Sequence, residues 1–178
     1  MADSLRIIVL LGTARTGRQS EKVAAVVRAC AEGHGFAVDF VDVKDHLQSF
    51  TEEREIKAWS QKVLAADGLI IVSPEYNHGY PGELKLLLDS AYAEYNHKPL
   101  GIVGVSDGPA GGIRMAEQLR LVAVTLGLVP IRAIVHFAMV KELFDQSGAL
   151  KDKEAWEKKL EVLCQEMEWY ARALKAAR

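Results

Sequence analysis

The sequence predicts an α/β protein in which helices cover both faces of a five-stranded parallel sheet. Five short apolar runs recur along the chain, and segments with the spacing of amphipathic helices separate them. Polar loops containing glycine or proline follow the first, third and fourth runs. Strands that alternate with helices are typical of parallel sheets, because each crossover needs a long connection.

The apolar runs differ in a way that places them in the sheet. The first, third and fourth are apolar at almost every position, which is typical of strands buried on both faces. The second alternates between apolar and polar residues, as an edge strand does. The fifth begins close to Pro130, at a position where a strand tolerates proline. The five expected strands are residues 7–11, 36–43, 69–72, 100–105 and 128–135.

Helices are expected after each strand, and the last spans about residues 153–175. Ser20 is expected to cap the first helix. The helix after Gly82 shows a wide apolar face, which predicts a homo-oligomer, at least a dimer, unless the whole face packs on the sheet. That face consists of Leu84, Leu87, Leu88, Ala91, Tyr92 and Tyr95.

A chain of 178 residues with this pattern predicts a single domain over residues 1–178. Two strand orders are common in doubly wound sheets, and the polar loop after the first strand favours the flavodoxin-like order 2-1-3-4-5 over the Rossmann order. In either order, ligands bind beyond the carboxyl ends of the strands.

Composition excludes several classes of function. A net charge of −2 argues against a general nucleic-acid binder. No apolar stretch reaches the ~18 residues of a membrane span, and the first residues lack the order of a signal peptide. We therefore expect a cytoplasmic protein. Cys30 and Cys164 form no CxxC motif, which favours two buried thiols over a disulfide, a redox pair or a zinc site.

The loop after the first strand is rich in hydrogen-bond donors. It leads into a helix N-terminus, where free N–H groups and the helix dipole favour an anion. A polar surface loop with two solvated arginines would have a similar composition, but the crowding of donors favours a phosphate site. The candidate residues are Thr13, Arg15, Arg18, Gln19 and Ser20.

The loop after the third strand offers a rigid wall for a flat aromatic ligand. Two prolines and two glycines set its shape, and its candidate residues are Pro74, Glu75, Tyr76 and Asn77. Glu75 could act as an acid or base, but a structural role in bonding nearby backbone N–H groups is favoured. His78 is more typical of a solvated loop residue than of a catalytic one.

The loop after the fourth strand contains glycines that let the backbone approach a ligand closely. Its candidate residues are Ser106, Gly108, Gly111 and Gly112. The two adjacent glycines open a helix and could donate N–H groups to a ring edge. This composition is common in turns, so it indicates a ligand site only in combination with the other two loops.

Together the three loops resemble the NADPH-dependent FMN reductase family, which includes quinone, azo-dye and chromate reductases. The resemblance rests on the Gly12-Thr13-x-Arg15…Ser20 loop, the Gly108…Gly111-Gly112 turn and the specific Pro74-Glu75-Tyr76-Asn77…Pro81-Gly82-x-Leu84-Lys85 segment. It extends from the first strand to about residue 135. Thr13 replaces a common serine and keeps the hydroxyl group.

The resemblance implies an enzyme that passes electrons from NADPH or NADH through bound FMN to quinones, free flavin or similar small acceptors. Its members form dimers or tetramers. The flavin performs the chemistry, so no catalytic side chain is assigned. Two alternatives remain open, a flavodoxin-type electron carrier and a flavin-binding protein without turnover. The sequence does not distinguish NADPH from NADH.

Overall fold

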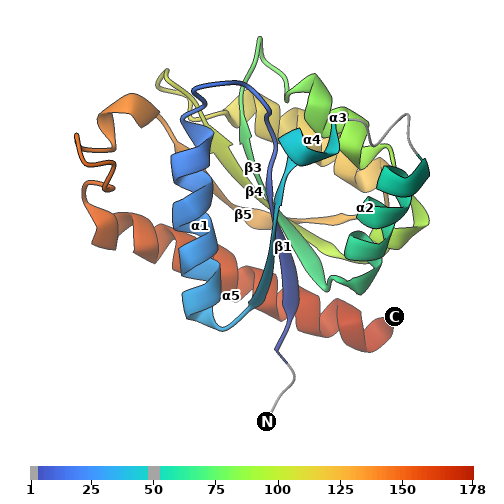
Figure 1. The fold of residues 1–178 in the computed structure, drawn as a ribbon. Helices are drawn as coiled ribbons and strands as arrows, with labels where there is room; N and C mark the ends of the chain where they lie inside the picture. The colour runs from blue at the N-terminus through green and yellow to red at the C-terminus, as the bar shows by residue number, and fades with distance from the viewer. Residues whose placement is uncertain (1–3, 48–52) are drawn as a thin grey trace.

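The five strands form one parallel sheet in the order β2-β1-β3-β4-β5, as the computed structural model shows (Figure 1). The structure describes residues 4–47 and 53–178. The order confirms the flavodoxin-like prediction, and each predicted strand end is within two residues of the observed one. The strands are β1 (Arg6–Leu11), β2 (Ala37–Asp42), β3 (Gly68–Pro74), β4 (Pro99–Val105) and β5 (Val129–Phe137).

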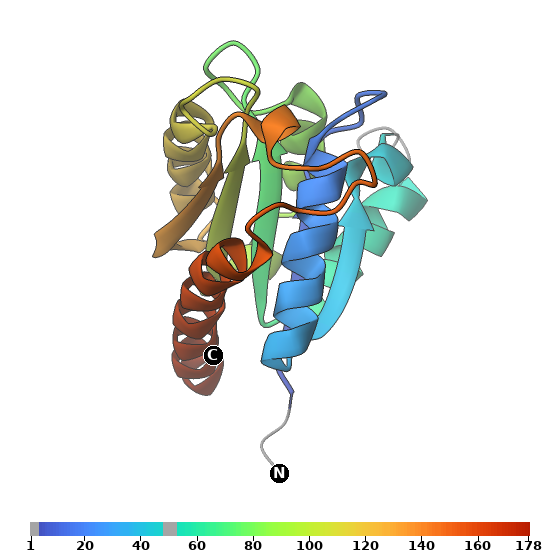
Figure 2. The same cartoon turned by 90° about the vertical axis from the view of Figure 1, so that its left-hand side faces the viewer.

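Helices cover the sheet from both sides (Figures 1 and 2). On one face lie α1 (Ser20–His34) and α5 (Lys153–Ala177). On the other lie α2 (Glu53–Ala65), α3 (Gly82–Leu88) and α4 (Ile113–Thr125). Short 3₁₀ turns follow β2, α3 and β5, and these are η1 (Val43–His46), η2 (Ala93–Tyr95) and η3 (Val140–Glu142).

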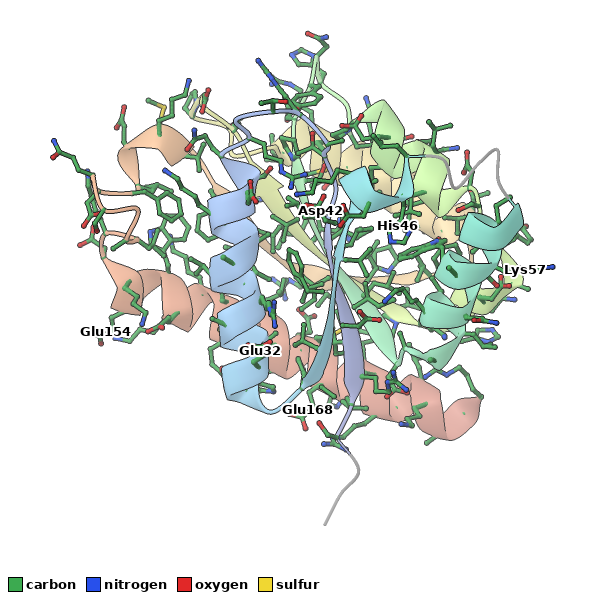
Figure 3. The ribbon with its side chains drawn as sticks, viewed as in Figure 1. Glu32, Asp42, His46, Lys57, Glu154 and Glu168 are labelled. Carbon is green, nitrogen blue, oxygen red and sulfur yellow. The ribbon has the colours of Figure 1, made fainter. Side chains whose placement is uncertain are left out.

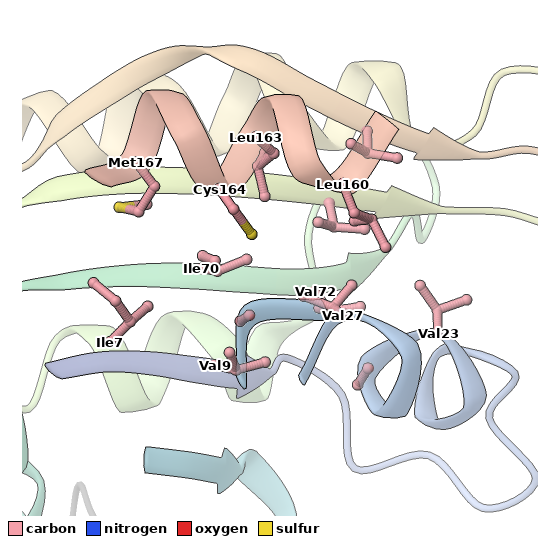
Figure 4. Packing of buried hydrophobic residues seen from close by; sticks show 14 of the residues in the cluster. Ile7, Val9, Val23, Val27, Ile70, Val72, Leu160, Leu163, Cys164 and Met167 are labelled. Atoms are coloured by element: carbon pink, nitrogen blue, oxygen red, sulfur yellow. The ribbon is translucent and has the colours of Figure 1, made fainter. Parts of the chain in front are cut away.

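The alternation of side chains along β1 divides the core into two layers. Ile7 and Val9 belong to the cluster beneath α1 and α5, whereas Ile8 and Leu10 belong to the cluster beneath the other helices. Figure 4 shows Ile7 and Val9 on the same side of the sheet as Met167 of α5. Burying one such aliphatic side chain contributes about 1.5–3 kcal/mol. The central strands are therefore held from both sides, which fixes where their carboxyl ends lie.

The helix after Gly82 is shorter than its apolar spacing predicts. It ends at Leu88, where the Ser90 hydroxyl donates to the carbonyl of Leu87 at 2.6 Å and the backbone tightens into turns. The predicted apolar face is buried within the chain at every position apart from Tyr92, which is 67% exposed, and the neighbouring Leu86 is 44% exposed. The wide apolar face is therefore explained by packing inside one copy, and it no longer supports a homo-oligomer.

The two cysteines are free thiols, Cys164 buried and Cys30 half-buried between α1 and α5. This agrees with the expectation for Cys164, and Cys30 is more accessible than expected. Over residues 4–47 and 53–178, no helix combines the length and the apolar character that a membrane crossing requires.

Lys98 is a buried cation at the end of the sheet opposite the loops described above. Its ammonium donates to the carbonyls of Val63 and Leu64, the last of these at 3.0 Å, at the C-terminus of α2. Burial lowers the pKa of Lys98 from its ordinary 10.5 to about 8, and the charge of Arg178 adds to this effect. Folding therefore favours the neutral amine.

The sign of this shift predicts a pH dependence of stability. Below about pH 8 the folded chain bears the full cost of a buried charge, and this cost falls as the pH rises from about 8 to 10.5. The free energy of unfolding of the wild type, minus that of Lys98→Met, should therefore increase across this window. Urea titrations at several pH values measure it, with the exposed Lys158→Met as control. A difference that stays flat with pH would contradict the assignment.

Candidate functional site

The loops after β1, β3 and β4 meet at the carboxyl edge of the sheet and surround a cavity of about 260 Å³. Backbone hydrogen bonds join the starts of these loops to the neighbouring strands, from Gly12 N to the Val72 carbonyl at 2.9 Å and from Glu75 N to the Val105 carbonyl at 3.1 Å. This is the crevice in which doubly wound sheets bind ligands. The cavity is lined by Arg15, Thr16, Gly17, Arg18, Gln19, Ser20, Pro74, Glu75, Tyr76, Val105, Ser106, Asp107, Val140 and Lys141.

Ser20 has a buried hydroxyl without a hydrogen-bond partner among the described residues. The residue is 2% exposed and is the first residue of α1. The prediction that Ser20 caps the helix is wrong, because Gln19 occupies the N-cap position and makes no side-chain cap bond. A buried hydroxyl left unpaired costs free energy, so its position on the cavity wall fits a bound group that supplies the partner.

The two arginines of the first loop have different surroundings. The Arg18 guanidinium, 4% exposed, donates to the carbonyl of Thr13 and to both carboxylate oxygens of Asp42. Figure 3 labels Asp42 at the end of β2. Arg15 is exposed, and its guanidinium lies 5.9 Å from the ring centre of Tyr76. Arg15 is therefore the arginine that can turn to a ligand, whereas Arg18 holds the loop.

The pKa values of the buried pair follow from its geometry. Burial acts to raise the pKa of the Asp42 carboxyl, but hydrogen bonds from the Arg18 guanidinium and from Lys44 N outweigh it and hold that pKa below its usual value. The hydrogen bonds to Asp42 also raise the pKa of Arg18. Both groups are charged at neutral pH, and the loop is anchored electrostatically to the end of β2.

Thr13 joins the first loop to the second instead of lining the cavity. Its buried hydroxyl lies 2.9 Å from the Tyr76 hydroxyl and donates to the Glu83 carboxylate at 3.0 Å. Ala14 N donates to the same carboxylate oxygen at 2.9 Å. Thr13 therefore positions Tyr76, which lies on the cavity wall.

The second loop folds back on itself as a tight hairpin. Tyr76 and Gly79 exchange two backbone hydrogen bonds of 2.9 Å, and the residues between them, Asn77 and His78, have φ of 48° and 69°. Positive φ at both central positions is typical of a type I′ turn, in which asparagine is favoured. Asn77 is exposed at this turn, outside the cavity wall, and His78 is exposed, as expected of a solvated residue.

Glu75 has the structural role expected from the sequence. Its carboxylate accepts from Arg114 N at 3.1 Å and from Met115 N at 3.3 Å, at the N-terminus of α4. The Arg114 guanidinium lies 3.4 Å away. A carboxylate at this end of a helix satisfies free N–H groups and interacts favourably with the helix dipole.

The third loop packs its glycines against β4. The Ser106 hydroxyl donates to the Gly108 carbonyl at 2.8 Å and accepts from Gly111 N at 2.9 Å. Gly111 and Gly112 have φ of 61° and 79°, and a Cβ on Gly104 would collide with the Gly111 carbonyl. Of this loop's candidate residues, Ser106 lines the cavity, while Gly108, Gly111 and Gly112 shape the turn behind it.

Some residues of the cavity wall were not among the candidates from the sequence, and two of them lie outside the three loops. Val140 and Lys141 follow β5, in a part of the chain where no motif was found. The signal that could have found them is their position, because the carboxyl end of β5 lies at the same edge as those of β1, β3 and β4. Asp107, within the third loop, was also not selected.

Sequence comparison places the chain among known proteins. The profile of the NADPH-dependent FMN reductase family matches residues 5–142. The chain belongs to this family. Membership confirms the resemblance noted above and the prediction of an NAD(P)H-dependent oxidoreductase that uses FMN.

Individual members of the FMN reductase family are similar over much of the chain. An NAD(P)H-dependent FMN reductase of Schizosaccharomyces pombe is 36% identical over 132 residues, covering 66% of this chain and 65% of that protein. A 2-hydroxy-1,4-benzoquinone reductase of a Burkholderia species is 33% identical, covering 71% of this chain and 74% of that protein.

Solved structures agree on the fold. FerB, a flavoenzyme NAD(P)H:(acceptor) oxidoreductase of Paracoccus denitrificans, superposes with a TM-score of 0.75 at 19% identity, covering 94% of this chain and 98% of that one. A Streptococcus pneumoniae flavodoxin superposes with a TM-score of 0.59 at 20% identity, covering 93% and 98%.

Because the Arg18–Asp42 pair anchors the first loop, breaking it should destabilise this member of the FMN reductase family. Asp42→Ala leaves the buried Arg18 charge without its carboxylate, so the free energy of unfolding should fall by about 3–5 kcal/mol. Asp39→Ala, which breaks the more exposed pair with Lys62, should cost about 1 kcal/mol or less. Chemical denaturation measures both. Equal losses in the two variants would show that the Arg18–Asp42 pair has no special role.

Proposed function

We propose that the cavity at the carboxyl edge of the sheet holds the phosphate of FMN. The observation that carries this proposal is the unpaired, buried Ser20 hydroxyl at the N-terminus of α1. A phosphate oxygen there would accept from Ser20 and from backbone N–H groups of the loop, with the helix dipole and Arg15 supplying positive charge. Gln19, on the same wall, adds an amide donor.

In this proposal the flavin ring lies against Pro74, Glu75, Tyr76 and Asn77, with Gly111 and Gly112 near its other edge. The fixed hairpin supports a rigid wall, because Tyr76 is bonded to both Thr13 and Gly79. Arg18 acts indirectly, by holding the loop that presents Arg15 and Ser20. Mutating each of these residues and measuring the affinity for FMN tests whether it binds the cofactor.

We propose that the chain catalyses electron transfer from NADPH or NADH to small acceptors such as quinones or free flavin. FMN supplies the electron-carrying chemistry, and the side chains bind and orient the partners. The similarity to a 2-hydroxy-1,4-benzoquinone reductase supports quinones as the acceptor class. No side chain of the cavity is required as an acid or base, and Glu75 is engaged with α4.

A flavodoxin-type electron carrier is the second candidate, because flavodoxins share the fold. The net charge of −2 and the free Arg15 favour the enzyme, since electron carriers of that type are strongly acidic. Anaerobic addition of NADPH to the flavin-loaded protein distinguishes the two. Bleaching of the flavin absorbance within seconds supports the enzyme, and reduction that takes longer than minutes supports the carrier.

We further propose a cytoplasmic homodimer or homotetramer that binds neither membranes nor nucleic acids. Two free thiols fit a reducing compartment. Apolar residues that are exposed on α4 and α5, such as Leu121 at 73% and Trp169 at 66%, support the association. Sedimentation at micromolar concentration tests it, and a stable ~20 kDa species would contradict it.

The phosphate site predicts the effect of two substitutions on FMN binding. Arg15→Ala should weaken binding by about 1.5–3 kcal/mol, because a charge-assisted hydrogen bond is lost. Ser20→Ala should also weaken binding, but it should leave the apoprotein at least as stable, because the lost hydroxyl has no partner in the chain. Titration of apoprotein followed by flavin fluorescence measures the affinities.

Thr125→Ala, at the far end of α4, serves as the control and should leave the affinity unchanged. If Arg15→Ala and Ser20→Ala both bind FMN as the wild type does, the phosphate site lies elsewhere. Tight binding of FAD instead of FMN would defeat the cofactor assignment.

A further inference from the structure

The segment that follows β5 contributes Val140 and Lys141 to the cavity wall and then passes toward α1. Figure 2 shows it in orange, passing in front of the upper end of α1. Its start is bonded to the third loop, from Met139 N to the Gly108 carbonyl and from Val140 N to the Ser106 carbonyl, both at 3.0 Å. Further on, Lys22 of α1 lies 5.5 Å from the ring centre of Phe144. The segment is therefore attached both to the third loop and to α1, and η3 begins at the first attachment.

Lys141 of η3 faces Asp107 of the third loop at the cavity wall. The ammonium and carboxylate are 2.7 Å apart, and their side chains are 67% and 55% exposed. Both residues line the same cavity as Ser20. Val140 beside it is buried, so the backbone at this point is anchored while the lysine side chain remains free to turn.

Apart from the exposed Arg15, the other charged side chains on the cavity wall are already paired. Arg18 is held by Asp42, and Glu75 by Arg114 and the N-terminus of α4. Asp107 is therefore the carboxylate that an incoming phosphate would meet, and Lys141 is the cation that offsets it. An exposed ion pair contributes little to stability, so exchanging the carboxylate for a phosphate is not opposed by a strong existing bond.

We propose that Lys141 is a specificity determinant for phosphorylated flavin. Asp107 holds the ammonium beside the cavity, and on binding the ammonium pairs with the ligand phosphate opposite Arg15 and Ser20. The pairing moves no covalent bond, and it makes the site select FMN over riboflavin, which lacks the phosphate. This inference rests on the proposed FMN site, and it adds a residue from outside the motifs that define that site.

The proposal gives opposite signs for the two members of the pair. Lys141→Ala should weaken FMN binding about ten-fold, because a charge-assisted contact is lost and Asp107 is left unpaired. Asp107→Asn should strengthen FMN binding a few-fold, because it removes a competitor for the lysine. Riboflavin affinity should change in neither variant. Lys153→Ala, which removes one charge from the start of α5, controls for net charge.

Fluorescence titrations of each apoprotein with FMN and with riboflavin, at low and at high salt, make this test. The effect of Lys141→Ala on FMN should shrink at high salt, because ions screen exposed charges. A structural ion pair would instead give equal losses in both variants, or losses shared by riboflavin, and either result overturns the proposal. If Lys141→Ala binds FMN like the wild type while Arg15→Ala does not, this inference fails and the FMN site stands. Wild-type protein that binds no FMN would instead refute the proposed function.

Discussion

The buried ion pair between Arg18 and Asp42 is the interaction on which the cavity depends most. It ties the loop after β1 to the end of β2, and the same guanidinium holds the carbonyl of Thr13. Thr13 in turn forms hydrogen bonds with Tyr76 and Glu83, so the first loop holds the second loop in position. Without that pair, the N-terminus of α1 would lose the wall that surrounds Ser20. A local charge pair thus supports a ligand site that it does not itself enter.

The site combines rigid backbone with a few side chains that are free to respond. Glu75 fixes the N-terminus of α4, and the glycine turn packs against β4. Arg15 and Lys141 are the exposed cations of this cavity wall, and they come from the loop after β1 and the segment after β5. A preorganised frame lowers the cost of binding, because few groups lose freedom when the ligand arrives.

The sequence predicted the sheet order and the three loops because both depend on local patterns. Apolar runs mark buried strands, and parallel strands place their carboxyl ends at one edge. It did not predict which polar groups would pair. The sequence alone does not distinguish the roles of Arg15 and Arg18. In the fold, Arg18 pairs with Asp42, which lies 24 positions further along the chain. The apolar residues after Gly82 suggested a partner chain, because a pattern does not show that α2 and η1 already cover them. Lys141 belongs to no recognised motif, and only the fold shows that it lines the cavity.

The account requires that the phosphate of FMN lie at the N-terminus of α1, and a crystal structure of the FMN complex tests this most directly. The predicted result is a phosphate oxygen at about 2.7–2.8 Å from the Ser20 hydroxyl, the usual length of such a hydrogen bond. Arg15 should lie close to the phosphate, with the Arg18–Asp42 pair unchanged. A phosphate bound elsewhere, with the Ser20 hydroxyl still buried and unpaired, would contradict the account.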